Sequence, residues 1–180
     1  MTFTRMDRST QAQWQDIFTE TVQAQPEVAD HVLGLLRSLG DLTFGFAVDQ
    51  LTHCLQTATR AEEAGADAEV VVASLCHDVG KAVSVPNHPR IAAEILRSYV
   101  REDVFHVVET HQDFQGRHYY RYLDMDPDLR RQYVDEPWYD LAVTFADDWD
   151  QASFDPDYPT KPLEHFEPLV RQVFGQPHRL

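Results

Sequence analysis

Apolar residues recur along most of the chain at intervals of three and four positions, the period of an amphipathic helix. No sustained alternation with a period of two is present, and seven glycines in 180 residues leave little room for tight hairpins. The pattern therefore predicts an all-α protein. We expect helices over roughly residues 9–24, 27–38, 46–64, 67–79, 88–99, 102–112, 127–134, 137–152 and 163–174.

Several helices carry residues that commonly begin or end them. Gly65 follows "ATRAEEA" and is expected to stop one helix, Asp67 to cap the next, and Pro89 to occupy a first turn. The proline-rich stretch "FDPDYPTKPLEHFEP" predicts an extended strap before a short last helix.

We find no repeat, low-complexity tract or linker, so residues 1–180 are expected to form one domain. Its core is expected over about residues 40–155, with N-terminal helices over 9–38 and the C-terminal strap and helix over 153–180.

The predicted helix over 67–79 is apolar on nearly every side, which is typical of a helix at the centre of a domain. His77 and Asp78 end it and are therefore expected to be buried. A buried carboxylate must be neutralised or coordinated, because leaving it alone in the interior costs several kcal/mol. A divalent metal meets this need, since histidine and aspartate are common ligands. The alternative is a helix end whose two side chains only bond to neighbouring loops.

Other histidines strengthen the metal interpretation. His88 and His111 each share a face with the apolar residues of their own helix, so both are expected to point inward. His106 projects to the opposite side and is expected to be solvated. His53 faces away from its helix's apolar stripe, so it is buried only if another element covers that side.

A last acidic ligand is available in "FADDWDQ". Asp147 lies opposite the apolar stripe of this helix, whereas Asp148 and Asp150 flank the stripe on its two edges. Helical phase does not separate these two residues.

Net charge and composition limit the classes of partner and the compartment that we expect for this protein. A net charge of -15 and a pI near 4.8 repel phosphate backbones and anionic lipids, so neither nucleic acid nor a membrane is expected to bind. No apolar stretch approaches the ~20 residues that span a bilayer, and the N-terminus lacks a signal-like apolar run. We therefore expect a cytoplasmic protein. Cys54 and Cys76 are interpreted as buried thiols.

The order His53, "HD" at 77 and 78, and a late Asp resembles the HD-domain superfamily of all-helical, metal-dependent phosphohydrolases. The stretch from "GFAVDQLTHCLQ" to "SLCHDVGK", followed by "NHPRIAAEIL", "ETHQ" and "WDQ", is similar to its branch of diiron oxygenases. That branch includes phosphonate-cleaving oxygenases and, more distantly, myo-inositol oxygenase. The similarity covers roughly residues 40–155, and the additional His88 and His111 favour the oxygenase branch.

The resemblance implies a helical bundle with two metal ions in its core. The ligands of the first iron would be His53, His77, Asp78 and Asp150, the last selected by its "WD" context. Asp78 would bridge to the second iron, which His88 and His111 complete. The pair would be mixed-valent Fe(II)/Fe(III) and would use O2 to oxidise or cleave a small polar substrate.

Three positions depart from the phosphonate-cleaving members. Thr43 and Phe46 stand where those proteins carry a tyrosine and a glutamate, and Asp147 replaces a basic residue that helps to hold the phosphonate. The known aminoethylphosphonate substrate is therefore not assigned, and a hydroxylated organophosphonate cleaved at its C–P bond is one candidate.

Lys81 follows the "HD" pair as in "HDxGK" relatives, in which the lysine contacts substrate oxygens. We therefore expect it to serve in catalysis and substrate binding, with a cation at a helix C-terminus as its alternative role. Gln50, Arg117 and Asp147 are further candidate substrate-binding residues.

The leading hypothesis is therefore a diiron oxygenase that acts on a small molecule with O2. The first alternative is a phosphohydrolase that uses Mn or another divalent metal on a nucleotide or phosphate ester. The second is a metal-stabilised regulatory module without turnover. The sequence leaves the oligomeric state open.

Overall fold

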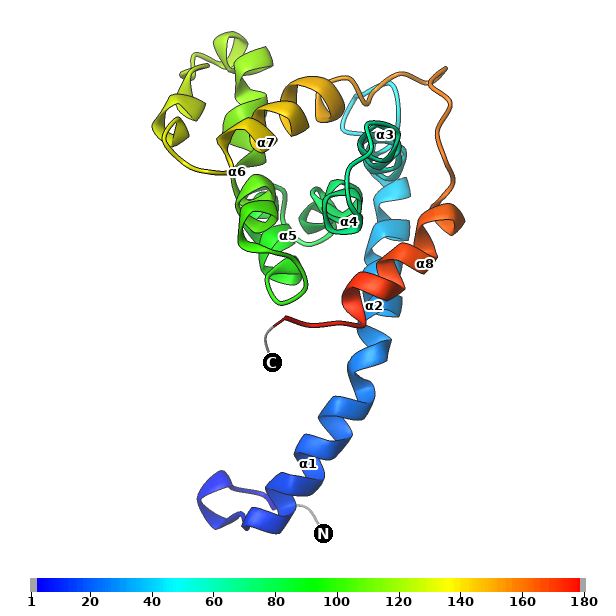
Figure 1. The fold of residues 1–180 in the computed structure, drawn as a ribbon, viewed down its shortest axis with the longest axis vertical. Coiled ribbons are helices and arrows are strands. Elements are labelled where there is room, and N and C mark those ends of the chain that lie inside the picture. The colour runs from blue at the N-terminus through cyan, green and yellow to red at the C-terminus, as the bar shows by residue number, and fades with distance from the viewer. Residues whose placement is uncertain (1–2, 179–180) are drawn as a thin grey trace.

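The computed structural model describes residues 3–178, and this part of the chain contains helices, turns and extended segments but no strand. The all-α prediction is confirmed (Figure 1). The α-helices are α1 (Gln11–Ala24), α2 (Val28–Ser38), α3 (Gln50–Glu63), α4 (Ala68–Cys76), α5 (His88–Leu96), α6 (Glu102–Tyr119), α7 (Tyr139–Thr144) and α8 (Leu163–Phe174).

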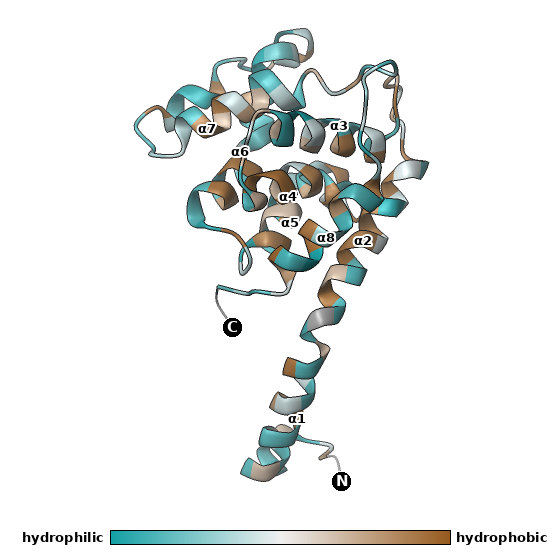
Figure 2. Ribbon diagram, turned by 45° about the vertical axis from the view of Figure 1, so that its right-hand side comes forward, coloured by the Kyte–Doolittle hydropathy of each residue, from teal (hydrophilic) through white to brown (hydrophobic). Residues whose placement is uncertain are grey.

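Helix α4 lies at the centre of the body, where α3, α6 and α8 pack against it. Every residue from Val70 to Cys76 is buried, as its uniformly apolar sequence predicts. The hydropathy colouring shows this helix in brown at the middle of the molecule (Figure 2). The chain therefore delivers the "HD" dipeptide, which follows α4 directly, into the interior.

The residues predicted to begin and end helices do so. The Asp67 side chain accepts hydrogen bonds from the backbone N–H groups of Glu69 and Val70, at 3.0 and 3.2 Å, and thereby caps α4. Gly65 has a φ of 80°, the left-handed conformation that terminates α3. Pro89 lies in the first turn of α5.

Four boundaries differ from the prediction. Residues 46–49 precede α3 as a turn, because Asp49 caps the helix by accepting from the Thr52 N–H. Helix α6 continues to Tyr119, and the segment predicted as a helix over 127–134 is a 3-10 helix, Leu129–Tyr133. The helix predicted over 137–152 divides into α7 and a π-helix, Phe145–Asp150.

The C-terminal strap is extended as predicted and runs along the edge of the body to α8 (Figure 1). It is held to α3 by a hydrogen bond from Gln56 Nε2 to the Asp155 carbonyl at 2.7 Å. Cys54 and Cys76 are buried free thiols, and burial raises the pKa of the Cys76 thiol to about 12. Within residues 3–178, no helix is long and apolar enough to span a membrane.

The cap of α4 gives the first testable prediction. Asp67→Ala leaves two N–H groups without their acceptor and should lower the free energy of unfolding by about 1 kcal/mol, measured by chemical denaturation. Asp67→Asn keeps a capping oxygen and should recover most of that loss, because the ion pair of Asp67 with Arg101 is largely exposed. Equal destabilisation by both substitutions would show that the ion pair, not the cap, stabilises this end of α4.

Candidate metal centre

The six residues predicted as metal ligands come together inside the body, and none is more than 5% exposed. They come from α3, from the turn after α4, from the first position of α5, from α6 and from the end of the π-helix. In chain order they are His53, His77, Asp78, His88, His111 and Asp150.

The first group of donor atoms gathers around one carboxylate oxygen of Asp78. Asp78 Oδ2 lies 3.4 Å from His53 Nε2 and 3.5 Å from His77 Nε2. Asp150 Oδ1 lies 3.1 and 3.6 Å from the same two nitrogens. The two imidazole nitrogens are themselves 3.1 Å apart. Four donor atoms thus surround a single point.

The second group gathers around the other oxygen of the same carboxylate. Asp78 Oδ1 lies 3.0 Å from His88 Nε2 and 3.5 Å from His111 Nε2. These two nitrogens are 3.3 Å apart. The two oxygens of Asp78 therefore face two different pairs of histidines.

Hydrogen bonds at the far side of each ring fix which nitrogen faces the centre. Every Nδ1 lies within hydrogen-bond distance of a backbone carbonyl, which can only accept, so Nδ1 carries the proton and a neutral ring presents the Nε2 lone pair inward. The acceptors are the carbonyls of Ser153 for His53, at 2.9 Å, Ser74 for His77, at 2.8 Å, Val85 for His88, at 2.7 Å, and Val108 for His111, at 2.7 Å.

The cluster attracts positive charge. Burial opposes ionisation of Asp78 and Asp150, but the neighbouring His77 and the other basic groups outweigh it and hold the pKa of both carboxyl groups below the ordinary value. Burial lowers the pKa of His77, yet the two carboxylates raise it above its usual range. Burial keeps the pKa of His111 below its ordinary value. A proton on His77 can supply part of the required charge, and a metal ion can supply more.

The donor set fits divalent metal ions. Asp78 Oδ1 and Asp150 Oδ2 are buried without a hydrogen-bond partner among residues 3–178, which is costly for carboxylate oxygens unless a cation is bound. Atoms bound about 2.1 Å from one ion at right angles lie about 3 Å apart, close to the separations within each group. Two sets of three residues have all their ligand atoms within 4.8 Å of one another: His53, His77 and Asp150, and His77, Asp78 and His111.

Gly80 explains how α5 reaches the cluster. A Cβ atom at this position would lie 2.3 Å from the His88 carbonyl oxygen and 2.8 Å from its Cα. Only a residue without a side chain allows the turn after Asp78 to touch the start of α5. This contact brings His88 next to Asp78.

The geometry of the π-helix determines which aspartate of this segment enters the cluster. Asp150 is fully buried in the cluster, whereas Asp148 is exposed. The wider turn of a π-helix changes the angular spacing of its side chains, so a phase counted at 3.6 residues per turn does not apply there. Gln115 Nε2 donates to Asp150 Oδ1 at 3.1 Å and helps to orient it.

Two of the predicted substrate-binding residues lie beside the cluster. The Lys81 ammonium contacts Asp78 Oδ2 and donates to Gln50 Oε1 at 2.7 Å. Gln50 is completely buried, and its Nε2 has no hydrogen-bond partner among the described residues. Lys81 thus has a fixed position next to Asp78, with 15% of its side chain exposed.

A pocket of about 520 Å³ opens beside the cluster, and its wall includes Lys81, His88 and Gln115. Aromatic rings form much of the remaining wall. Phe154 stacks on the His53 ring, with 4.2 Å between centroids, and on Phe46, at 4.5 Å. A continuous aromatic stack therefore runs from the pocket wall to a candidate ligand.

Of the four predicted substrate-binding residues only Lys81 lines this pocket; Gln50, Arg117 and Asp147 do not. Arg117 is exposed. Asp147 accepts from Arg130 Nη1 at 2.9 and 3.0 Å and lies 2.9 Å from His118 Nε2. Because His118 does line the pocket, Asp147 reaches it only through this histidine.

Sequence reasoning missed Gln115, His118 and Phe154. Gln115 and His118 follow His111 by four and seven positions, so their place on the inward face of α6 was readable from the helical period. Phe154 lies in the irregular strap, where no periodicity applies. The half-buried His106, predicted to be solvated, stacks on Trp138 instead and is not part of the cluster.

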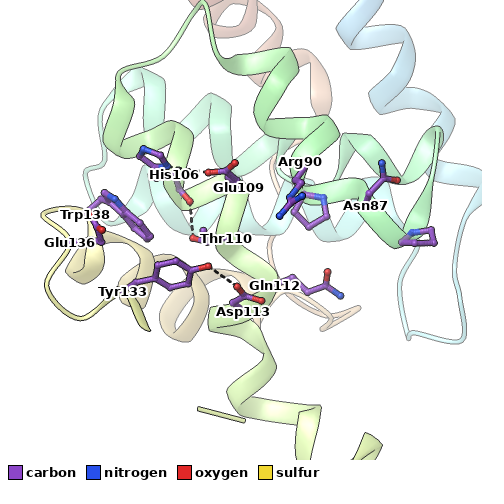
Figure 3. Close-up of a pocket in the computed structure, with 12 residues that line it drawn as sticks. Asn87, Arg90, His106, Glu109, Thr110, Gln112, Asp113, Tyr133, Glu136 and Trp138 are labelled. Atoms are coloured by element: carbon purple, nitrogen blue, oxygen red, sulfur yellow. Dashed lines mark hydrogen bonds and ion pairs between the residues drawn. The ribbon is translucent and has the colours of Figure 1, made fainter. Parts of the chain in front are cut away.

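A larger pocket of about 610 Å³ lies between α5, α6 and the segment before α7 (Figure 3). Its wall carries Arg90, Glu109 and Asp113, and the Tyr133 hydroxyl donates to Asp113 at 2.9 Å. None of the six candidate ligands lines it. The smaller pocket, whose wall includes His88, is therefore the one that adjoins the cluster.

Comparison with known families agrees with this geometry. Residues 51–153, more than half of the chain, match the HD domain family, and the chain belongs to that family. The matched range contains all six candidate ligands. Members of this family are generally metal-dependent enzymes. No curated protein is significantly similar in sequence to this chain.

Because each oxygen of Asp78 faces a different pair of histidines, we predict two metal ions per chain. His88→Ala and His111→Ala should each leave the fold intact and lower the metal content from two equivalents toward one, because each removes a donor from one group only. Asp78→Ala should lose both ions, since both groups share its carboxylate. Metal analysis of purified protein, with circular dichroism for the fold, provides the measurement.

His106→Ala is the matched control, because this histidine lies on α6 with His111 but outside the cluster. It should keep both equivalents. If His88→Ala and His111→Ala also retained two ions, the second group would not be a metal site.

Proposed function

We propose that the protein is a diiron oxygenase that uses O2 to oxidise or cleave a small polar metabolite. The observation that carries this proposal is the division of the Asp78 carboxylate between two groups of histidines. An iron pair bound there would supply one-electron redox chemistry. Six protein ligands for two ions leave coordination positions free for substrate and O2.

In this proposal Lys81 would orient the substrate, and Gln50 would hold Lys81. The Lys81 ammonium is partly exposed in the pocket wall, while its contacts with Gln50 and Asp78 restrict its position. A charged donor held in this way binds an oxygen-rich group at lower entropic cost than a free lysine. Gln50 is completely buried and does not line the pocket, so it would act by holding Lys81 in position rather than by touching the substrate.

The aromatic side of the pocket excludes water and favours a particular substrate shape. Phe154 covers the His53 ring, and Phe44, Phe46 and Tyr119 extend this surface toward the entrance. A ligand with an oxygen-rich end near Lys81 and an apolar or cationic end on the rings matches both sides. The two Asp147 oxygens already bond to Arg130 and His118, so the rings rather than this carboxylate would hold a cationic end.

Hydroxylated organophosphonates fit this description, including those with a quaternary ammonium group, and cleavage of the C–P bond would be the corresponding reaction. Small polyols are the second class to test. The principal competing function is a phosphohydrolase, because membership of the HD family supports metal-dependent hydrolysis as well. Such an enzyme would activate a water molecule with Mn(II) or another divalent ion.

The role of Lys81 can be tested by substitution. Lys81→Ala should reduce kcat/KM by about ten- to a hundredfold, the effect of losing a charged hydrogen bond of roughly 1.5–3 kcal/mol. Steady-state kinetics and the metal content of the same preparation should be measured together, because Lys81 also contacts Asp78.

The only other lysine of the chain, Lys161, pairs with Glu62 at the surface and provides the control. Lys161→Ala should keep wild-type kinetics. Wild-type kinetics in Lys81→Ala, with a slightly lower Tm, would restrict Lys81 to a structural role at the end of its helical turn.

Oxygen consumption separates the two functions. The iron-loaded, partly oxidised protein should give the EPR signal of a coupled Fe(II)/Fe(III) pair, and this signal should shift when a true substrate binds. Turnover should consume O2, followed with an oxygen electrode.

The matched experiment uses the Mn(II)- or Mg(II)-loaded protein with nucleotides and an aryl phosphate. Phosphate release from these esters, without O2 uptake on any phosphonate or polyol, would replace the oxygenase proposal with the hydrolase.

A further inference from the structure

His118 lies in the wall of the pocket beside the cluster but is not part of the cluster. It occupies the last turn of α6 and follows His111 by seven positions, so it lies about 10 Å farther along the helix. Its side chain is 34% exposed and lines the pocket together with Lys81 and Gln115. His118 therefore reaches a part of the pocket that is remote from His111.

A carboxylate holds the ring of His118. The Nε2 atom lies 2.9 Å from Asp147 Oδ1, and Asp147 accepts from Arg130 Nη1 at 2.9 and 3.0 Å. Arg130 is only 8% exposed, and a buried guanidinium requires an anionic partner such as Asp147. Because a carboxylate in an ion pair can only accept, His118 Nε2 carries a proton and donates to it.

These three residues come from three different elements. His118 belongs to α6, Arg130 to the 3-10 helix Leu129–Tyr133 and Asp147 to the π-helix Phe145–Asp150. The ion pair of Arg130 with Asp147 would by itself join the last two elements, without any histidine. The additional bond to His118 fixes a ring that lines the pocket, and the ring is therefore oriented before a ligand arrives.

The other ring nitrogen, Nδ1, makes no hydrogen bond to any residue within 3–178. In a neutral ring whose Nε2 carries the proton, Nδ1 has a lone pair and accepts a hydrogen bond. Arg130 already balances the charge of Asp147, so the contacts of His118 do not require a charged ring. The proton is thus on the opposite nitrogen from that in the four histidines of the cluster, which carry it on Nδ1.

We infer that His118 Nδ1 accepts a hydrogen bond from a hydroxyl group at the end of the substrate that is remote from the cluster. Asp147 and Arg130 act through His118 and are positioning residues. The inference rests on the proposed function, which assigns this pocket to the substrate, and it narrows the substrate class. Phosphonates and polyols with a second hydroxyl at the far end fit both Lys81 and His118, whereas a quaternary ammonium group has no proton to donate.

An acceptor in this position discriminates between ligands. A site arranged to bond a hydroxyl disfavours the analogue that lacks it, because the polar group of the protein is then left without a partner. The rings of Phe44, Phe46 and Phe154 in the same wall offer no other acceptor for that hydroxyl. Since His118 is partly exposed and water can replace the ligand, we expect a preference of about tenfold.

Calorimetric titration of the full-length, metal-loaded protein without O2 tests this preference. The two ligands are hydroxypropylphosphonate with a terminal hydroxyl and butylphosphonate, in which a methyl group replaces that hydroxyl. The wild-type protein should bind the first about tenfold more tightly. His118→Phe keeps a ring in the wall and should abolish the preference while leaving the affinity for butylphosphonate unchanged. His118→Asn keeps an acceptor near the position of Nδ1 and should retain most of the preference.

The tautomer of His118 can be measured without any ligand. Correlation of the ring nitrogens and protons by NMR, in protein loaded with diamagnetic Zn(II), should show the proton of His118 on Nε2. Asp147→Asn introduces an amide that can donate to Nε2 and should shift the proton toward Nδ1. Asp148→Asn is the matched control, because Asp148 is exposed, and it should leave the tautomer unchanged.

Equal affinity of the wild-type protein for the two ligands, an intact preference in His118→Phe, or a proton on His118 Nδ1 would each overturn the inference. Neither measurement requires O2, so the two proposals fail separately. A hydroxyl preference that depends on His118 would stand even if no oxygen were consumed. A protein that consumes O2 without this preference would keep the proposed reaction and lose only the role of His118.

Discussion

A carboxylate held at the centre of an apolar body must be balanced by positive charge or by donor groups, and Asp78 is such a carboxylate, 1% exposed. The surrounding elements are arranged to meet this demand. Helix α3 contributes His53, α5 contributes His88, and Lys81 contacts Asp78 from the following turn. The close approach of α5 depends on Gly80, where any side chain would collide with backbone. The contact between Gly80 and the start of α5 therefore sets both the packing of α5 and the position of His88 beside Asp78.

The features of the sequence that are local and periodic were predictable. The apolar run of α4 indicated that His77 and Asp78 are buried, and helical phase placed His88 and His111 toward the interior. These inferences needed only the 3.6-residue period and the cost of burying charge. His53 could not be placed in this way, because its burial depends on a segment a hundred positions later, where the Ser153 carbonyl accepts its Nδ1–H.

The parts of the site that could not be predicted lie in irregular segments, where helical periodicity does not apply. The choice between Asp148 and Asp150 depends on a π-helix, which carries no clear sequence signal. The turn before α3 has left-handed backbone at Phe44 and Gly45, with φ values of 50° and 86°, and sets Phe46 against Phe154. Several residues of the pocket wall come from such segments, which is why the residues of the buried cluster were easier to predict than the groups that would select a substrate.

The cluster also joins parts of the chain that are far apart. Its donors extend from His53 to Asp150, so the site cannot form until helices from most of the body have assembled. Contacts of such long range slow folding, because the entropy of closing large loops is lost before the contacts form. Any metal ion held by this cluster would therefore bind late in folding, and it would act as a cross-link that slows unfolding more than it accelerates folding.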